Sequence, residues 1–212
     1  DNYPPVGEGQ ISPSTCPEGY RGYAYRTCSN GQLGEVKMDM CRMKVPENAR
    51  YSRSRYQFVM NTKSQTDVPT CQNIVTRWYM DDGVVLPEGL TLNAQTGQIT
   101  GIPTDTSDIF TFTVYAENDA GAASAIISIS VRKGQCKAEG VFPVTDVDSL
   151  AEYQCSMQGS YIGTQTRACV LGETDGVWQK ASGYCMPVMM IVILVLVVII
   201  IVVVVVFLLM RM

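Results

Sequence analysis

The sequence contains no histidine, and this absence removes several kinds of chemistry. Histidine is the commonest general base, proton shuttle and transition-metal ligand in proteins. Catalytic triads built on histidine are therefore excluded. The eight cysteines never form a C-x-x-C pair, and neighbouring cysteines are separated by at least 11 residues. Disulfide bonds are thus favoured over a zinc site, whose ligands come in closely spaced pairs.

Other absences narrow the set of partners. None of the seven asparagines lies in an Asn-x-Ser/Thr sequon, so no N-glycan is predicted. The net charge is −4 and no basic stripe is present, which argues against a nucleic-acid partner. Ca²⁺ takes about six to eight oxygen ligands, and no single acidic pair in the sequence supplies that many. The sequence therefore predicts no bound metal, no cofactor and no enzymatic activity. The acidic pairs are Asp81–Asp82, Asp105 with Asp108, Glu117 with Asp119, and Asp146 with Asp148.

A long hydrophobic run lies at the end of the chain. From Pro187 to Met210 there are 24 residues without a charge, an amide or a glycine. A helix of this length spans about 36 Å, and a bilayer core is about 30 Å thick. The run is apolar all round, unlike an amphipathic core helix. A lipid-anchor signal is the other alternative, but the small residues at 181–183 are not followed by the polar spacer such a signal needs. The sequence predicts a transmembrane helix over 187–210.

The flanks of this helix indicate its orientation. Residues 211–212 form the expected cytoplasmic stub, where Arg211 is a positive stop signal. The even number of cysteines upstream suits an oxidising compartment, so the N-terminal part is expected outside. No leader precedes Asp1, which predicts a processed form whose signal peptide has been removed. We therefore expect a single-pass type I protein of the plasma membrane or another surface membrane.

The middle segment, residues 45–133, has the pattern of antiparallel strands. Apolar and polar side chains alternate over 111–116 and again over 127–132, and turn residues separate such stretches. The run LPEGLTLNAQTGQITGIPT (86–104) followed by FTFTVYAENDAGAASAIISISV (110–131) resembles immunoglobulin-like and dystroglycan-type cadherin-like modules. This resemblance implies a β-sandwich, with Trp78 as an inward aromatic. The predicted packing residues are Leu86, Leu90, Leu92, Ile99, Phe112, Val114, Ile127 and Ile129.

The segment from 134 to 186 contains four cysteines, a glycine-tyrosine turn and a tryptophan shortly before the last cysteine. Their order and approximate spacing resemble a complement-control (sushi) module. In that family the first cysteine bonds the third and the second bonds the fourth. The resemblance therefore implies the disulfides Cys136–Cys169 and Cys155–Cys185, with Trp178 as a core residue.

The segment from 1 to 44 resembles a shortened copy of that sushi module. Its spacing C-x₁₁-C-x₁₂-C and its Gly-x-x-x-Arg-x-Cys motif also resemble the small cysteine-rich module of hormone and adhesion receptors. The resemblance implies a Cys16–Cys41 bond. Cys28 and Cys71 then remain, and parity predicts that they bond each other and tie this segment to the sandwich.

The predicted fold class is all-β: small disulfide-rich modules flank an immunoglobulin-like or cadherin-like sandwich, and one C-terminal transmembrane helix follows. Tyrosine and arginine, which are enriched at interface hot spots, are concentrated in the part furthest from the membrane. Arg53 also belongs to a basic run, 50–55, that could meet an acidic or sulfated partner or could simply be a solvated linker. The predicted binding residues are Tyr20, Arg21, Tyr23, Tyr25, Tyr51, Arg53 and Tyr56.

Two functions fit this organisation. The first is a structural or adhesive surface protein that binds other proteins through its β modules, as a homo- or hetero-oligomer. The second is an accessory or anchoring subunit of a larger membrane complex or extracellular filament. The predicted helix has no small-residue pair and no polar residue to drive association, so a partner within the membrane would have to pack against its valines and isoleucines.

Overall fold

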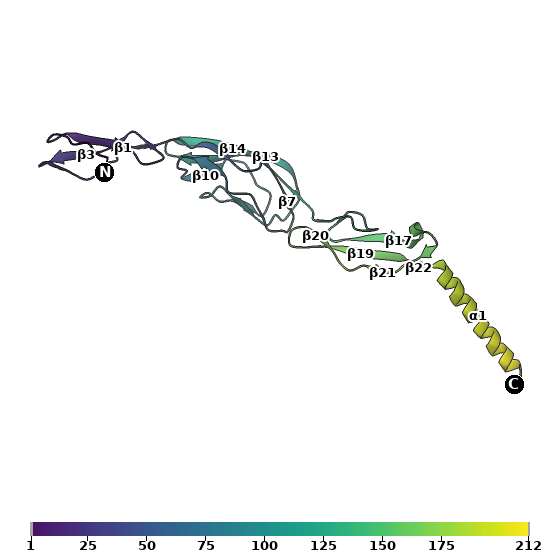
Figure 1. Ribbon diagram of the computed structural model, residues 1–212. Helices are drawn as coiled ribbons and strands as arrows, with labels where there is room; N and C mark the ends of the chain where they lie inside the picture. Colours follow the sequence, from purple (N-terminus) through teal and green to yellow (C-terminus); the bar gives the residue numbers. More distant parts are fainter. Residues whose placement is uncertain (1, 212) are drawn as a thin grey trace. The chain divides into compact units, whose positions relative to one another are not determined.

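The computed structural model describes residues 2–211 and divides into two units, Asp1–Arg132 and Lys133–Met212. Strands make up most of the ordered elements, with one short 3₁₀ helix and one C-terminal α-helix among the described residues (Figure 1). The prediction of an all-β chain with a single apolar helix at its end is confirmed.

Short strands make up the first 44 residues. β1 (Ile11–Thr15) pairs with β3 (Tyr23–Ser29), which also pairs with β4 (Gln32–Leu33). β2 (Tyr20–Arg21) pairs separately with β5 (Arg42–Met43). This segment and the sandwich that follows belong to the same unit.

The strands between residues 47 and 132 form two main sheets and one separate two-stranded pair around one core. They are β6 (Glu47–Arg50), β7 (Arg55–Val59), β8 (Ser64–Gln65), β9 (Thr70–Gln72), β10 (Arg77–Met80), β11 (Leu90–Leu92), β12 (Ile99–Gly101), β13 (Ser107–Asn118) and β14 (Gly121–Arg132). One sheet has the order β10-β13-β14-β7 and the other the order β11-β12-β8, while β6 pairs with β9. β7 runs parallel to β14, and the other pairs are antiparallel.

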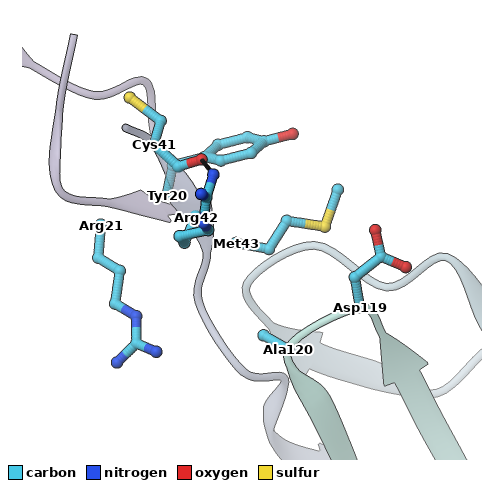
Figure 2. A pocket seen from close by; sticks show the side chains of 7 residues that line it. All are labelled: Tyr20, Arg21, Cys41, Arg42, Met43, Asp119 and Ala120. Atoms are coloured by element: carbon cyan, nitrogen blue, oxygen red, sulfur yellow. Dashed lines mark hydrogen bonds between the residues drawn. The ribbon is translucent and has the colours of Figure 1, made fainter. Parts of the chain in front are cut away.

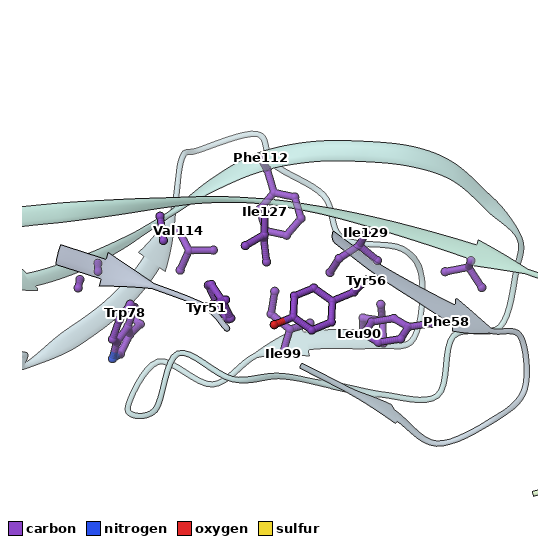
Figure 3. Close-up of a cluster of buried hydrophobic side chains, with 14 residues drawn as sticks. Tyr51, Tyr56, Phe58, Trp78, Leu90, Ile99, Phe112, Val114, Ile127 and Ile129 are labelled. Atoms are coloured by element: carbon purple, nitrogen blue, oxygen red, sulfur yellow. The ribbon is translucent and has the colours of Figure 1, made fainter. Parts of the chain in front are cut away.

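The core lies between these two sheets (Figure 3). Alternate side chains of β13 and β14 are buried, which confirms the predicted period of two. Trp78 is buried on β10, as predicted. Two of the predicted packing residues, Leu86 and Leu92, are partly buried and pack against the core. The others are fully inside it: Leu90, Ile99, Phe112, Val114, Ile127 and Ile129.

The turn between β11 and β12 explains the residues of the motif around it. The Asn93 side-chain oxygen accepts hydrogen bonds from the backbone N–H groups of Gln95 and Thr96, at 2.9 and 3.1 Å. Gly97 has a φ of +73°, and a Cβ there would come within 2.6 Å of the Trp78 ring. Only glycine combines this left-handed conformation with so close an approach. The hairpin is therefore built to contact the core.

The second unit begins with several short strands and one 3₁₀ turn. They are β15 (Gln135–Cys136), β16 (Thr145–Asp146), β17 (Ser149–Gln154), η1 (Cys155–Gln158), β18 (Tyr161–Ile162), β19 (Thr164–Leu171), β20 (Gly176–Trp178), β21 (Ser182–Gly183) and β22 (Met186–Pro187). β19 is central, because it pairs with β17, β20 and β21. The ring of Trp178 packs near Phe142, and its Nε1 donates to the Lys137 carbonyl oxygen at 2.7 Å.

The chain continues into α1 (Val188–Arg211), a helix of 24 residues. None of its described side chains is buried. It is the one helix among residues 2–211 that is long and apolar enough to cross a membrane. The bounds of the helix expected over 187–210 differ from these by one residue at each end.

Three disulfides are present in the described structure. They are Cys16–Cys41, Cys136–Cys169 and Cys155–Cys185. These are the pairs implied by the sushi resemblance. The last two hold the small second unit together, where apolar burial alone would give little stability.

The expected Cys28–Cys71 bond is absent, because both cysteines are free thiols. Cys28 is buried near the end of β3, which leads away from the sandwich (Figure 1). Cys28 lies five positions after Tyr23, which is about 17 Å along the strand. Cys71 lies on β9 of the sandwich, and its sulfur is 3.3 Å from the Glu47 carbonyl oxygen. A disulfide needs Cα atoms about 4.4–6.8 Å apart, so the direction of β3 prevents this bond.

Candidate binding surface

The first feature of the candidate surface is an exposed aromatic face on β3. Ala24 and Cys28 lie on one side of this strand and are buried. Tyr23 and Tyr25 lie on the opposite side, since successive side chains of a strand alternate. Their ring centroids are 6.2 Å apart, and Tyr23 is 37% exposed. The structure thus brings two of the predicted binding residues together on the surface.

Neighbouring charges hold the Tyr25 ring in place. Its hydroxyl donates a hydrogen bond to Asp39 Oδ2 at 3.2 Å, and Lys37 Nζ lies 5.8 Å from the centre of the ring. Desolvation, and then the negative charge of Asp39, raise the pKa of the Tyr25 hydroxyl. The group therefore remains a neutral hydrogen-bond donor at physiological pH.

A hollow of about 390 Å³ forms the second feature of the surface. The side chain of Met43 extends toward Asp119, and a dashed line joins the Arg42 guanidinium to the Cys41 carbonyl oxygen (Figure 2). Arg42 Nη1 donates to the Asp39 carbonyl oxygen at 2.7 Å, which fixes the position of that side chain. The lining residues are Tyr20, Arg21, Cys41, Arg42, Met43, Asp119 and Ala120. Apolar, cationic and anionic groups are thus all available to a partner.

A hydrogen bond from Asn118 to Lys44 joins the sandwich to the first segment beside this hollow. Asn118 is buried, and its side-chain nitrogen donates to the carbonyl oxygens of Lys44 and Ile74, both at 2.8 Å. The Lys44 N–H donates to the Gly19 carbonyl oxygen at 2.8 Å. A Cβ on Gly19 would lie 2.8 Å from the Ile74 side chain, so the backbone passes close to the sandwich here. These contacts connect the first segment to the sandwich, as the Cys28–Cys71 disulfide was expected to do.

Two of the predicted binding residues are core residues instead. Tyr51 is 7% exposed and Tyr56 is 2% exposed. The Tyr51 hydroxyl donates to the Gly97 carbonyl oxygen at 2.5 Å, and the Tyr56 hydroxyl donates to Asp67. Strand β7 turns Tyr56 and Phe58 inward, as its period of two requires (Figure 3). The flanking arginines made this stretch resemble a solvated linker, but the alternation Tyr-Gln-Phe is the sequence signal for a buried strand.

Arg53 is exposed, as predicted, but it belongs to another part of the surface. Its guanidinium carbon lies 4.8 Å from the centre of the Tyr56 ring. With Arg50 it lines a second hollow of about 360 Å³, whose other side includes Ser124 and Ile126. The basic run is therefore a separate, solvent-facing feature.

The sequence did not predict that Arg42, Met43 and Asp119 line one hollow together with Tyr20. The pairing of β2 with β5 places Tyr20 opposite Met43, and Asp119 comes from the turn between β13 and β14. The adjacent Cys16–Cys41 bond was the available signal, since it brings residues after 41 near those after 16. Among residues 2–211, no group of three or more histidine, cysteine or acidic side chains could hold a metal ion.

Comparison with known proteins identifies the middle segment. Residues 43–132 match the family model described as "Putative Ig domain". No curated protein matches the chain. These residues also have the paired sheets and the shared core described above, so they form an immunoglobulin-like module.

Several solved structures resemble parts of the chain. A putative alpha-galactosidase from Bacteroides fragilis NCTC 9343 is 26% identical over 44% of this chain, with a TM-score of 0.34. A second such protein from the same strain is 19% identical over 42% of this chain, also with a TM-score of 0.34. The chain spans only 19% and 18% of the length of these two proteins. The human protocadherin-24 EC1-2 fragment is 10% identical, with 67% of this chain and 96% of that one covered and a TM-score of 0.37. Nothing about activity or binding follows from these similarities.

Proposed function

We propose that the chain is a single-pass type I surface protein with an adhesive or structural role. The observation that carries this proposal is α1, whose 24 residues include no buried side chain. In water such a helix would expose an apolar surface on every side, whereas a bilayer solvates it. Disulfide-bonded β modules belong in an oxidising compartment, which supports placing them outside.

The proposed binding surface is the tyrosine face of β3 together with the hollow next to it. Tyr20, Arg21, Tyr23 and Tyr25 are the predicted residues that remain on the surface in this region. Tyrosine and arginine supply large contact areas and directional hydrogen bonds, and they dominate interface hot spots. Association through this surface requires no active site, in keeping with a non-enzymatic role.

The finer domain assignment is also a proposal. We infer that residues 134–186 are a sushi-like module and that residues 1–44 are a shortened relative of it. The bond pattern Cys136–Cys169 and Cys155–Cys185 supports the first assignment, because it joins the first cysteine to the third and the second to the fourth. Cys16–Cys41 supports the second, since it corresponds to the second-to-fourth bond.

The experiment is a cell-aggregation assay with the full chain displayed on suspension cells. We expect the double variant Tyr23→Ser/Tyr25→Ser to aggregate several-fold less than the parent, because it removes the exposed ring pair without opening a core. Tyr79→Ser/Tyr115→Ser is the matched control. These two tyrosine rings are also neighbours, with centroids 5.1 Å apart, but they lie on the outer face of the sandwich. The control should aggregate like the parent.

The accessory-subunit function is the alternative, and the same assay separates the two. It is favoured by the length of the uninterrupted valine and isoleucine surface of α1, which a neighbouring helix could pack against. If the parent chain causes no aggregation at normal surface levels, the adhesive role is wrong. If both double variants aggregate equally, the contact lies elsewhere than on the β3 face.

A further inference from the structure

One end of the module formed by residues 134–186 has no charge. The sequence contains no charged residue from Tyr153 to Thr166, and none from Ala181 to Met210. Folding brings these two stretches together, because β18 pairs with β22 and Cys155 bonds Cys185. The opposite end of β17 is charged, since Asp146 and Asp148 lie just before the first residue of this strand. The module is therefore electrostatically polarised along β17.

The uncharged end also exposes large apolar side chains. Met157, on the 3₁₀ turn η1, is 78% exposed, and Tyr184 is 69% exposed. Tyr161 and Ile162, on the adjacent strand β18, are exposed as well. Tyrosine is enriched at membrane–water interfaces, and the thioether and aliphatic groups beside these tyrosines add apolar surface.

The structure joins this end directly to the first turn of α1. The Val188 N–H donates a hydrogen bond to the Ser160 carbonyl oxygen at 2.9 Å, and β22 ends at Pro187, immediately before the helix. The η1 turn lies against β18, the partner of β22. The exposed apolar residues are thus grouped around the point where the chain would enter a membrane.

The length of the helix sets the depth of this point. A 24-residue helix is about 36 Å long, roughly 6 Å more than the hydrocarbon core. Centred in the bilayer, it begins about 3 Å outside the core, and the headgroup layer on each side is roughly 5–8 Å thick. Residues beside Val188 therefore fall within the headgroup layer.

We propose that this end of the module is a lipid-contacting seat, with Met157, Tyr161, Ile162 and Tyr184 in the headgroup layer of the outer leaflet. The proposal rests on the proposed transmembrane role of α1. The occupant is a lipid surface because the seat is continuous with the span and has no charge to repel or to desolvate. This lipid contact holds the module against the membrane, in addition to the covalent connection through α1.

The test uses the full chain in phosphatidylcholine vesicles whose acyl chains carry bromine near the headgroup. Tryptophan is introduced by Met157→Trp or Tyr184→Trp, and fluorescence is compared with that of the parent, which contains Trp78 and Trp178. We expect each new tryptophan to emit at shorter wavelength than one in water and to be quenched by the brominated lipid. Non-reducing peptide mapping of the Cys155–Cys185 bond verifies that each variant is folded.

Two controls separate the seat from the span. Leu150→Trp introduces an exposed tryptophan at the other end of β17 and should be unquenched and solvent-like. Phe207→Trp reports on α1 itself and should be quenched. The proposal is overturned if the signals of Met157→Trp and Tyr184→Trp match the Leu150→Trp control while Phe207→Trp is quenched. Blue-shifted emission without lipid quenching also overturns it, because a protein surface would then cover the seat. An unquenched Phe207→Trp contradicts the span, and the seat with it.

Discussion

Tyr51 and Tyr56 bring hydroxyl groups into the core of the sandwich, and each hydroxyl has a partner. Tyr51 donates to the Gly97 carbonyl oxygen, and Tyr56 donates to Asp67. Asp67 Oδ2 also accepts from the Ser52 N–H at 2.6 Å. Because buried polar groups are costly when unpaired, the Tyr51 contact fixes the segment between β6 and β7 against the β11–β12 turn. The contacts of Asp67 fix the same part of the chain against the segment between β8 and β9.

The ionisation of these tyrosines gives a testable pH dependence. Desolvation is the main cause that raises the pKa values of Tyr51 and Tyr56 in the folded chain. The folded state therefore holds these protons more tightly than the unfolded state does. This contribution is complete below the unfolded tyrosine pKa of about 10 and is lost as the pH rises above it.

The variant Tyr51→Phe should separate the contribution of the Tyr51 hydrogen bond to stability from that of its ionisation. Below about pH 10 the variant loses one hydrogen bond, which should lower the free energy of unfolding by roughly 0.5–1.5 kcal/mol. Above that pH, the stability of the variant should fall less steeply than that of the parent. Urea unfolding followed through the fluorescence of the two tryptophans, Trp78 and Trp178, measures both effects. Equal slopes for parent and variant would contradict the assigned role of the Tyr51 hydroxyl.

The two free thiols should differ in reactivity. Cys71 is partly exposed, but desolvation raises the pKa of its thiol, so little reactive thiolate forms at neutral pH. Cys28 is buried. We expect alkylation of the native chain to modify Cys71 slowly, with a rate that increases with pH, and to modify Cys28 only after unfolding. Recovery of a peptide pair linked through Cys28 and Cys71 would contradict the structure.

At the scale of elements, the β11–β12 hairpin depends on glycine. Gly97→Ala would place a Cβ 2.6 Å from Trp78 and 2.6 Å from Pro69, at a φ of +73°. Gly83, at a φ of +92°, has open space around it and is the matched control. Gly83→Ala should cost about 1–2 kcal/mol, from the backbone alone.

Gly97→Ala should cost roughly another 1–3 kcal/mol, because it also overpacks the core. Thermal unfolding of both variants measures the difference. A smaller loss of stability for Gly97→Ala than for Gly83→Ala would show that the turn relaxes freely and does not anchor the hairpin.

The sequence predicts elements better than it predicts contacts between them. Alternation along residues 111–116 and 127–132 is a local property, so the core positions of β13 and β14 could be identified directly. The distance between Cys28 and Cys71 depends on where β3 points, which no local pattern encodes. The hollow beside Tyr20 likewise depends on the long-range pairing of β2 with β5 and on the β13–β14 turn.

At the scale of the whole molecule, anchoring and binding are assigned to different parts of the chain. The candidate binding surface belongs to the unit Asp1–Arg132, and the apolar helix belongs to the unit Lys133–Met212. Substitutions on the β3 face should therefore change association without changing membrane retention. Release of the intact chain by a phospholipase would instead indicate a lipid anchor.

Alkaline carbonate extraction tests whether α1 spans the membrane. Membranes from cells that produce the full chain are washed with carbonate and sedimented, since this treatment releases peripheral proteins but retains integral ones. We expect the chain to remain entirely in the membrane pellet. Its appearance in the supernatant, with an integral membrane protein retained in the same pellet, would show that α1 does not span the membrane.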